Sequence, residues 1–162
     1  MTDINTGIQD LKFDEEAIKA GQKFANKLWN IARFTIMNLE NSKSEILNSK
    51  QIPNPKSQSD KQILEKLNQI IKSTDENLDS FRFGQAAHEL YDFVWHDLAD
   101  VYIEESKKDL NASVLLYVLI SSLKLLHPIM PFVTESIWQN LQANDLVEDK
   151  LLINAEWPEP NS

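Results

Sequence analysis

The 162-residue sequence contains no cysteine and only three glycines. The absence of cysteine excludes disulfides and thiolate metal sites and fits a reducing, cytoplasmic setting, which we expect for this protein. No apolar run approaches the roughly 18 residues of a membrane span. The first ten residues, MTDINTGIQD, also lack the basic and apolar regions of a signal peptide. We therefore expect a soluble protein that is not exported and has no membrane partner.

The motifs of the common catalytic sites are missing as well. The sequence has no GxxxxGK[ST], GxGxxG or GxSxG motif and no cysteine nucleophile. Neighbouring carboxylates such as Glu104-Glu105 and Glu148-Asp149 point apart on a helix, which favours surface charge over acid/base chemistry. We expect neither a catalytic site nor a bound cofactor in this chain.

The best candidate for a metal site is the set His88, Asp92 and His96, which recurs every fourth residue and so shares one helix face. An acidic, solvent-facing stripe with histidines as hydrogen-bonding partners has the same spacing, and it is the commoner case. None of the three histidines follows an acid by three residues, so the Glu-x-x-His pairs of a di-iron bundle are absent. We predict no metal site.

Apolar residues recur at helical spacing nearly throughout, which predicts an all-α bundle of about five helices in a single domain of residues 1–162. The predicted helices cover about 14–40, 59–78, 84–107 and 109–126, and a fifth begins at Pro131. The fourth is apolar almost all round and should be the central one. The remaining segments are a lead-in over 1–13, a polar loop over 41–58 that we expect to be mobile, and a tail over 143–162 that packs on the bundle.

Several details of these elements can be predicted from local signals. Asp14 should cap the first helix, with Phe13 stapled onto Ile18, and Ser59 with Gln62 has capping-box spacing for the second. In the tail, residues 151–153 should be extended, and Trp157-Pro158 should fold back on the bundle. The third helix should bury five apolar side chains, those of Ala87, Leu90, Val94, Leu98 and Val101.

The formal charge of −9 argues against attraction of nucleic acid to the whole surface, but the charge is unevenly distributed. Residues 1–59 carry eight basic and seven acidic side chains, whereas residues 60–162 carry eight basic and eighteen acidic ones. Residues 17–39 hold four basic side chains and no acidic one. A nucleic-acid face would therefore lie mainly on the first helix.

The segment Gly21 to Phe34, GQKFANKLWNIARF, divides into two stripes on a helix. One stripe faces a core, and its members are Ala17, Gly21, Phe24, Ala25, Leu28, Ile31, Ala32, Ile36 and Leu39. The other crowds into a wedge of about 120°, and its members are Lys19, Lys23, Asn26, Lys27, Asn30, Arg33 and Phe34. Such side chains neutralise phosphates, meet base edges and stack unpaired bases, although a basic stripe is more often a solvated face.

The chain resembles the anticodon-binding domain of valyl-tRNA synthetases, which are class I aminoacyl-tRNA synthetases. The resemblance covers about nine tenths of the chain. It rests on these blocks: GIQDLKFDEE (7–16), GQKFANKLWNIARF (21–34), DKQILEKL (60–67), FRFGQAAHELYDFVWHDLADVYIEESK (81–107), LKLLHPIMPFVTESIW (123–138) and AEWP (155–158). HPIMPF is also similar to leucyl and isoleucyl relatives, and the NKLWN-x-x-RF block favours valyl.

The resemblance implies a helix bundle that binds the anticodon stem-loop of a valine tRNA, with much of the contact surface on the first helix. Carried over by position, Lys27, Asn30, Arg33 and Phe34 would face the anticodon, and Lys23 lies one turn earlier on the same side. Phe34 would stack a base, Arg33 and Asn30 would bind base edges, and the two lysines would hold phosphates.

The chain departs from the family pattern at three positions, where Gln62 and Val101 replace tryptophans and Gly84 replaces an aspartate that begins a helix. Gly84 can still serve as a helix cap, and the other two changes should affect packing. The HIGH and KMSKS elements that the family uses with ATP are absent. The resemblance therefore implies that ATP chemistry belongs to the catalytic domain of a parent enzyme, which would be a second partner of this chain.

An alternative is a protein-interaction bundle. In that case the acidic face of the third helix or the apolar edge near Trp29 would dock another domain, for example the synthetase body. Trp29, like the other three tryptophans, is otherwise expected to be a packing residue.

Overall fold

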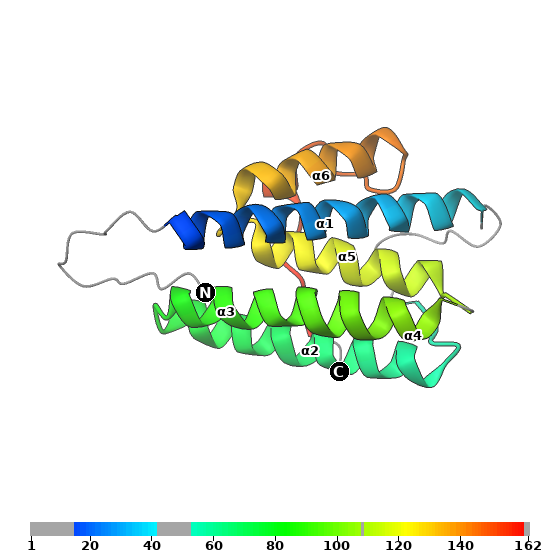
Figure 1. The fold of residues 1–162 in the computed structure, drawn as a ribbon, viewed down its shortest axis with the longest axis horizontal. Helices are drawn as coiled ribbons and strands as arrows, with labels where there is room; N and C mark the ends of the chain where they lie inside the picture. Colours follow the sequence, from blue (N-terminus) through cyan, green and yellow to red (C-terminus); the bar gives the residue numbers. More distant parts are fainter. Residues whose placement is uncertain (1–14, 42–52, 108, 161–162) are drawn as a thin grey trace.

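The computed structural model of the chain describes residues 15–41, 53–107 and 109–160 (Figure 1). Within these ranges every regular element is helical, which confirms the all-α bundle. No helix in the described part is long and apolar enough to cross a membrane. The predicted Asp14 cap, the Phe13 staple, the 1–13 lead-in and most of the 41–58 loop lie outside the described residues.

The bundle is made of long, roughly parallel rods (Figure 1). The first two are α1 (Glu15–Asn41) and α2 (Gln58–Asp79). A third rod is continuous from α3 (Phe83–Asp92) through a π-helical segment, η1 (Phe93–Ile103), into α4 (Glu104–Ser106). The chain then forms α5 (Ala112–Leu126), α6 (Pro131–Ala143) and a short 3-10 turn, η2 (Leu152–Asn154). The predicted helices are therefore all present, and their ends differ from the predictions by a few residues.

The central helix is α5, as its nearly continuous apolar sequence predicts. Twelve of its residues are buried, and it contacts α1, α2, α3 and α6. Asn111 caps its start by accepting a hydrogen bond from the Val114 backbone N–H at 3.4 Å. Because α5 has no exposed apolar stripe left, each helix around it must direct one apolar face inward.

The third rod differs from the prediction in its register. Ala87, Leu90, Val94 and Leu98 are buried as expected, but Val101 is 41% exposed and Tyr102 and Ile103 are buried in its place. The π-helical turns of η1 are the physical reason. In a π-helix the backbone hydrogen bond joins residue i to residue i+5, so one turn takes more residues than in an α-helix. The next residue on the face of Leu98 is therefore four or five positions later, not three.

The start of α2 also differs from the prediction, because Ser57 rather than Ser59 is the N-cap. The Asp60 backbone N–H donates to Ser57 Oγ at 3.1 Å, and the Asp60 carboxylate accepts from the Ser57 N–H at 3.2 Å. Aspartate therefore takes the part that glutamate or glutamine usually plays in a capping box. Gly84 is likewise no cap, since α3 begins at Phe83 with Arg82 in the N-cap position.

In the C-terminal tail one prediction is confirmed and one is wrong. Trp157 folds back on the bundle, where its Nε1 donates to Asp75 Oδ1 of α2 at 2.7 Å. The segment expected to be extended instead forms η2, which buries Leu152. The tail thus runs from the α6 side of the molecule to α2 (Figure 1).

The Asp60 carboxylate is only 1% exposed and links four parts of the chain. It accepts hydrogen bonds from the Lys56 N–H at 2.8 Å, Tyr102 Oη at 2.8 Å and Asn111 Nδ2 at 3.1 Å, in addition to Ser57. Burial raises the pKa of this carboxyl, but these hydrogen bonds outweigh it and hold the pKa below the ordinary value of 3.8. Burial raises the pKa of Tyr102, and the hydrogen bond to the Asp60 carboxylate raises it further.

We predict that Asp60→Asn lowers the free energy of unfolding by about 3 kcal/mol at neutral pH, because buried donors lose a charged acceptor. Since the folded pKa is lowered, the charge stabilises the fold fully above the unfolded pKa and less as pH falls through the folded pKa. Urea unfolding measures the difference in the free energy of unfolding between the parent protein and Asp60→Asn. This difference should stay constant above about pH 5 and become smaller below about pH 4. The control is Glu65→Gln, on the exposed face of α2. If it lowers the free energy of unfolding as much as Asp60→Asn does, the stabilising role of the Asp60 carboxylate is contradicted.

Candidate nucleic-acid interface

The core-facing stripe predicted for α1 is confirmed by burial. Its members Phe24, Leu28, Ile31, Ala32 and Leu39 are buried, and the rest of the stripe is partly buried. Thr35 adds a buried polar position that the sequence did not indicate, and its Oγ1 is satisfied by the Ile31 carbonyl at 2.8 Å. The stripe packs mainly on α5 and α6, so the opposite side of α1 must face outward.

The polar stripe of α1 faces outward, and most of its members are exposed. Lys19, Lys23, Asn26, Asn30 and Arg33 are exposed, whereas Lys27 and Phe34 are partly buried. Among the described residues, Lys23 and Arg33 form no ion pair. Two cations without an ion pair and two exposed amides, those of Asn26 and Asn30, are thus accessible on this face, which suits contact with a polyanion.

Lys27 is placed differently from the other cations. Its Nζ lies 2.9 Å from Asp100 Oδ1 of η1 and 5.1 Å from the ring centroid of Trp95. The hydrogen bond from Lys27 lowers the pKa of the Asp100 carboxyl below its ordinary value. This partner on another helix was not predicted, because no sequence spacing connects residues that are 73 positions apart.

Phe34 is partly buried and packs against the hydrophobic core. The buried part of its ring stabilises the bundle, and the remainder is exposed. Its carbonyl accepts from Asn38 Nδ2 at 2.7 Å, one turn later on α1. Trp29, at the edge of the polar stripe, also packs against the core, in agreement with the packing role expected for it.

The histidines of the third rod pair with acids one turn away. His88 Nε2 lies 3.5 Å from Asp92 Oδ2, and His96 Nδ1 lies 3.5 Å from Asp100 Oδ2. In the described part of the chain, no three His or acidic side chains are arranged to hold a metal ion. The regular spacing of His88, Asp92 and His96 therefore reflects two separate surface pairs.

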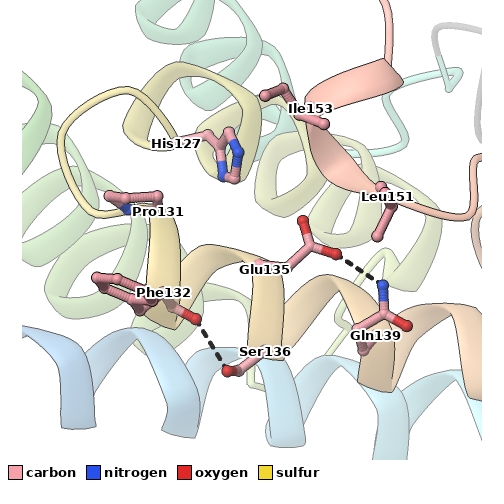
Figure 2. Close-up of a pocket in the computed structure, with 8 residues that line it drawn as sticks. All are labelled: His127, Pro131, Phe132, Glu135, Ser136, Gln139, Leu151 and Ile153. Atoms are coloured by element: carbon pink, nitrogen blue, oxygen red, sulfur yellow. Dashed lines mark hydrogen bonds between the residues drawn. The ribbon is translucent and has the colours of Figure 1, made fainter.

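A shallow cavity of about 470 Å³ lies away from this face, between α6 and η2 (Figure 2). Phe132 and Ile153 are 89% and 72% exposed at its rim, and Leu151 is partly so. Glu135 lies in the wall of the cavity. Its carboxylate accepts hydrogen bonds from Gln139 Nε2 at 2.6 Å and from the Leu152 N–H at 3.0 Å. The complete lining is His127, Pro131, Phe132, Glu135, Ser136, Gln139, Leu151 and Ile153.

Comparison with known proteins places this geometry in context. Residues 60–162 match the profile of the family "Anticodon-binding domain of tRNA ligase". The chain is 41% identical to the "Valine--tRNA ligase" of Petrotoga mobilis over 94% of its length, and 41% identical to that of Bacillus cereus over 93%. It spans only 18% and 17% of those relatives. These alignments leave out about a tenth of the chain or less, so they include α1, which the family profile does not.

The fold has a counterpart among solved structures. The crystal structure of the ternary complex of Agrobacterium radiobacter K84 agnB2 LeuRS with tRNA and LeuAMS matches with a TM-score of 0.71. The match covers 93% of this chain and 17% of that one, at 18% sequence identity. At this identity the likeness concerns the fold alone.

We predict that Phe34→Ala lowers the free energy of unfolding by about 1–2 kcal/mol, because part of the ring is buried against the core. Arg33→Ala should change it by less than about 0.5 kcal/mol, since Arg33 is exposed. Urea unfolding of both variants checks this difference. Equal stability of Phe34→Ala and the parent protein would mean that the ring adds nothing to the core.

Proposed function

The chain belongs to the family of anticodon-binding domains of tRNA ligases, and we propose that it binds the anticodon stem-loop of a valine tRNA through the outward face of α1. The observation that carries this proposal is the exposure of Lys23, Asn30 and Arg33 on a face with no acidic residue between positions 17 and 39. Phosphate binding depends on such local cations and tolerates a net negative charge elsewhere.

The proposed roles follow from the position and chemistry of each side chain. Arg33 and Asn30 are exposed and carry the donors and acceptors that read base edges. Phe34 offers the exposed part of its ring to an unstacked base, and Lys23 contacts the RNA backbone. Lys27 belongs to the same face but is already paired with Asp100, so its contact requires an exchange of partners.

In this proposal the domain contributes recognition to a valine–tRNA ligase, while the chemistry occurs elsewhere. The chain spans about a sixth of its relatives, and the ATP-using catalytic domain would lie in the remainder. That remainder is then the second partner, and the cytoplasm, where tRNA is charged, is the setting.

The test is binding of a synthetic valine anticodon stem-loop, measured by fluorescence anisotropy. Arg33→Ala should weaken binding by about 1–3 kcal/mol and reduce discrimination against a hairpin with an altered anticodon. Lys23→Ala should weaken both hairpins alike and flatten the salt dependence by about 0.7 in log–log slope.

The matched control is Lys72→Ala, which removes an exposed lysine from α2 instead of α1. It should bind as the parent protein does. If it weakens binding as much as Lys23→Ala, the attraction is general and the α1 face is not the site. Failure of the parent protein to bind the hairpin at millimolar concentration would refute the proposed function itself.

A second candidate function is docking onto the rest of the ligase polypeptide, and the α6–η2 cavity favours it. Phe132 is almost fully exposed although it is a large apolar side chain, and Ile153 is exposed on the opposite side of the same cavity (Figure 2). Large apolar side chains exposed around a cavity commonly mark a protein interface. The relatives hold over four fifths of their chain outside the matched part, which supplies the occupant.

We predict that Phe132→Ser weakens binding of this domain to the catalytic part of a valine–tRNA ligase, added as a separate polypeptide, by at least about 2 kcal/mol. Apolar docking should change little with salt, in contrast to RNA binding. Calorimetry at two salt concentrations checks both statements, with Ser136→Ala in the same wall as control. An unchanged affinity for Phe132→Ser would exclude this surface.

A further inference from the structure

The four cations of α1 between residues 17 and 39 are not equivalent. Lys19 pairs with Glu15 at 2.7 Å within its own helix. Lys27 is the member that an acid from another helix holds, and its side chain is 31% exposed. Among the described residues Lys23 and Arg33 remain without an ion pair. The face therefore presents two cations without an ion pair, one that is paired within α1 and one that is held by another helix.

The π-helical turns of η1 create the receptor for Lys27. Trp95 and Asp100 are five residues apart, and both contact the Lys27 ammonium. In an α-helix, residues five apart point about 140° away from each other. In a π-helix the hydrogen bond itself runs from i to i+5, so the two side chains lie one above the other on the same face.

The aromatic side of this receptor is held in place by neighbouring rings. Trp95 is stacked on Tyr91, with ring centroids 5.5 Å apart and planes at 16°. Phe24 of α1 extends the stack, 4.8 Å from Tyr91. Lys27 covers Trp95 in turn. Trp95 is thus positioned by its aromatic neighbours, and it holds the lysine beside Asp100.

We propose that Asp100 is an internal competitor of RNA phosphate for Lys27, and that Lys27 exchanges this carboxylate for a phosphate when RNA binds. The inference rests on the proposed function. A surface ion pair is weak because water screens it, so phosphate can displace the Asp100 carboxylate. The competition lowers the affinity of the domain for RNA below what the cations of α1 could supply. It also means that Lys27 contacts RNA only when a phosphate of the RNA backbone is correctly placed.

The test compares Asp100→Asn with Asp97→Asn in binding of the valine anticodon stem-loop. Both changes remove one negative charge from η1, but Asp97 pairs with Lys66 of α2 and does not contact Lys27. Asp100→Asn should bind the hairpin about two- to fivefold more tightly. Asp97→Asn should bind like the parent protein. Circular dichroism confirms that both variants are folded.

A double-mutant cycle identifies the lysine involved. Lys27→Ala should lose more affinity in the Asp100→Asn background than in the parent protein, because Lys27 no longer has to leave its carboxylate. If Asp100→Asn binds no more tightly than the parent, or if Asp97→Asn gains as much, the competition is refuted while RNA binding stands. If the parent protein binds no RNA, the proposed function fails, and this inference fails with it.

Discussion

The burial of α5 on all sides is the constraint on which the rest of the structure depends. A helix with twelve buried residues has to be surrounded, and α1, α2, α3 and α6 each contribute a face to it. Each of these helices then has only its opposite face for solvent or for ligands. The outward position of Lys23, Asn30 and Arg33 is therefore a consequence of core packing: turning them inward would bury charge and expose Phe24 and Leu28.

This constraint explains why much of the fold could be predicted from the sequence. Apolar period alone gives the helices, their faces and the central position of α5, because those features depend on which side chains leave water. The two stripes of α1 are the clearest case: Phe24 and Leu28 are buried, and Lys23 and Arg33 are exposed, as their spacing indicates. Which side chains of α1 face the core and which face outward could thus be predicted from the sequence.

The features that the sequence did not predict depend on contacts between elements. The π-helical register of η1 buries Tyr102 in place of Val101, and the Tyr102 hydroxyl then reaches Asp60 at 2.8 Å. Local spacing at 100° per residue contains no signal for that choice. The cap at Ser57 was missed for a similar reason. The Asp60 carboxylate that completes it is fixed also by Asn111, 51 residues later in the chain.

The same distinction applies to the proposed function of the α1 face. Which cations the helix displays is a local property, but which of them are free depends on the helices beside it. Residues 60–162 hold more acidic than basic side chains, which makes the net charge negative. One of these acids, Asp100 of η1, also lies 2.9 Å from Lys27. An accessible cation is one whose neighbours leave it unpaired. In the proposed function, the part of α1 where packing keeps the acids away from the cations therefore attracts RNA without any exchange of partners, and on the described part of α1 that region centres on Arg33 and Lys23.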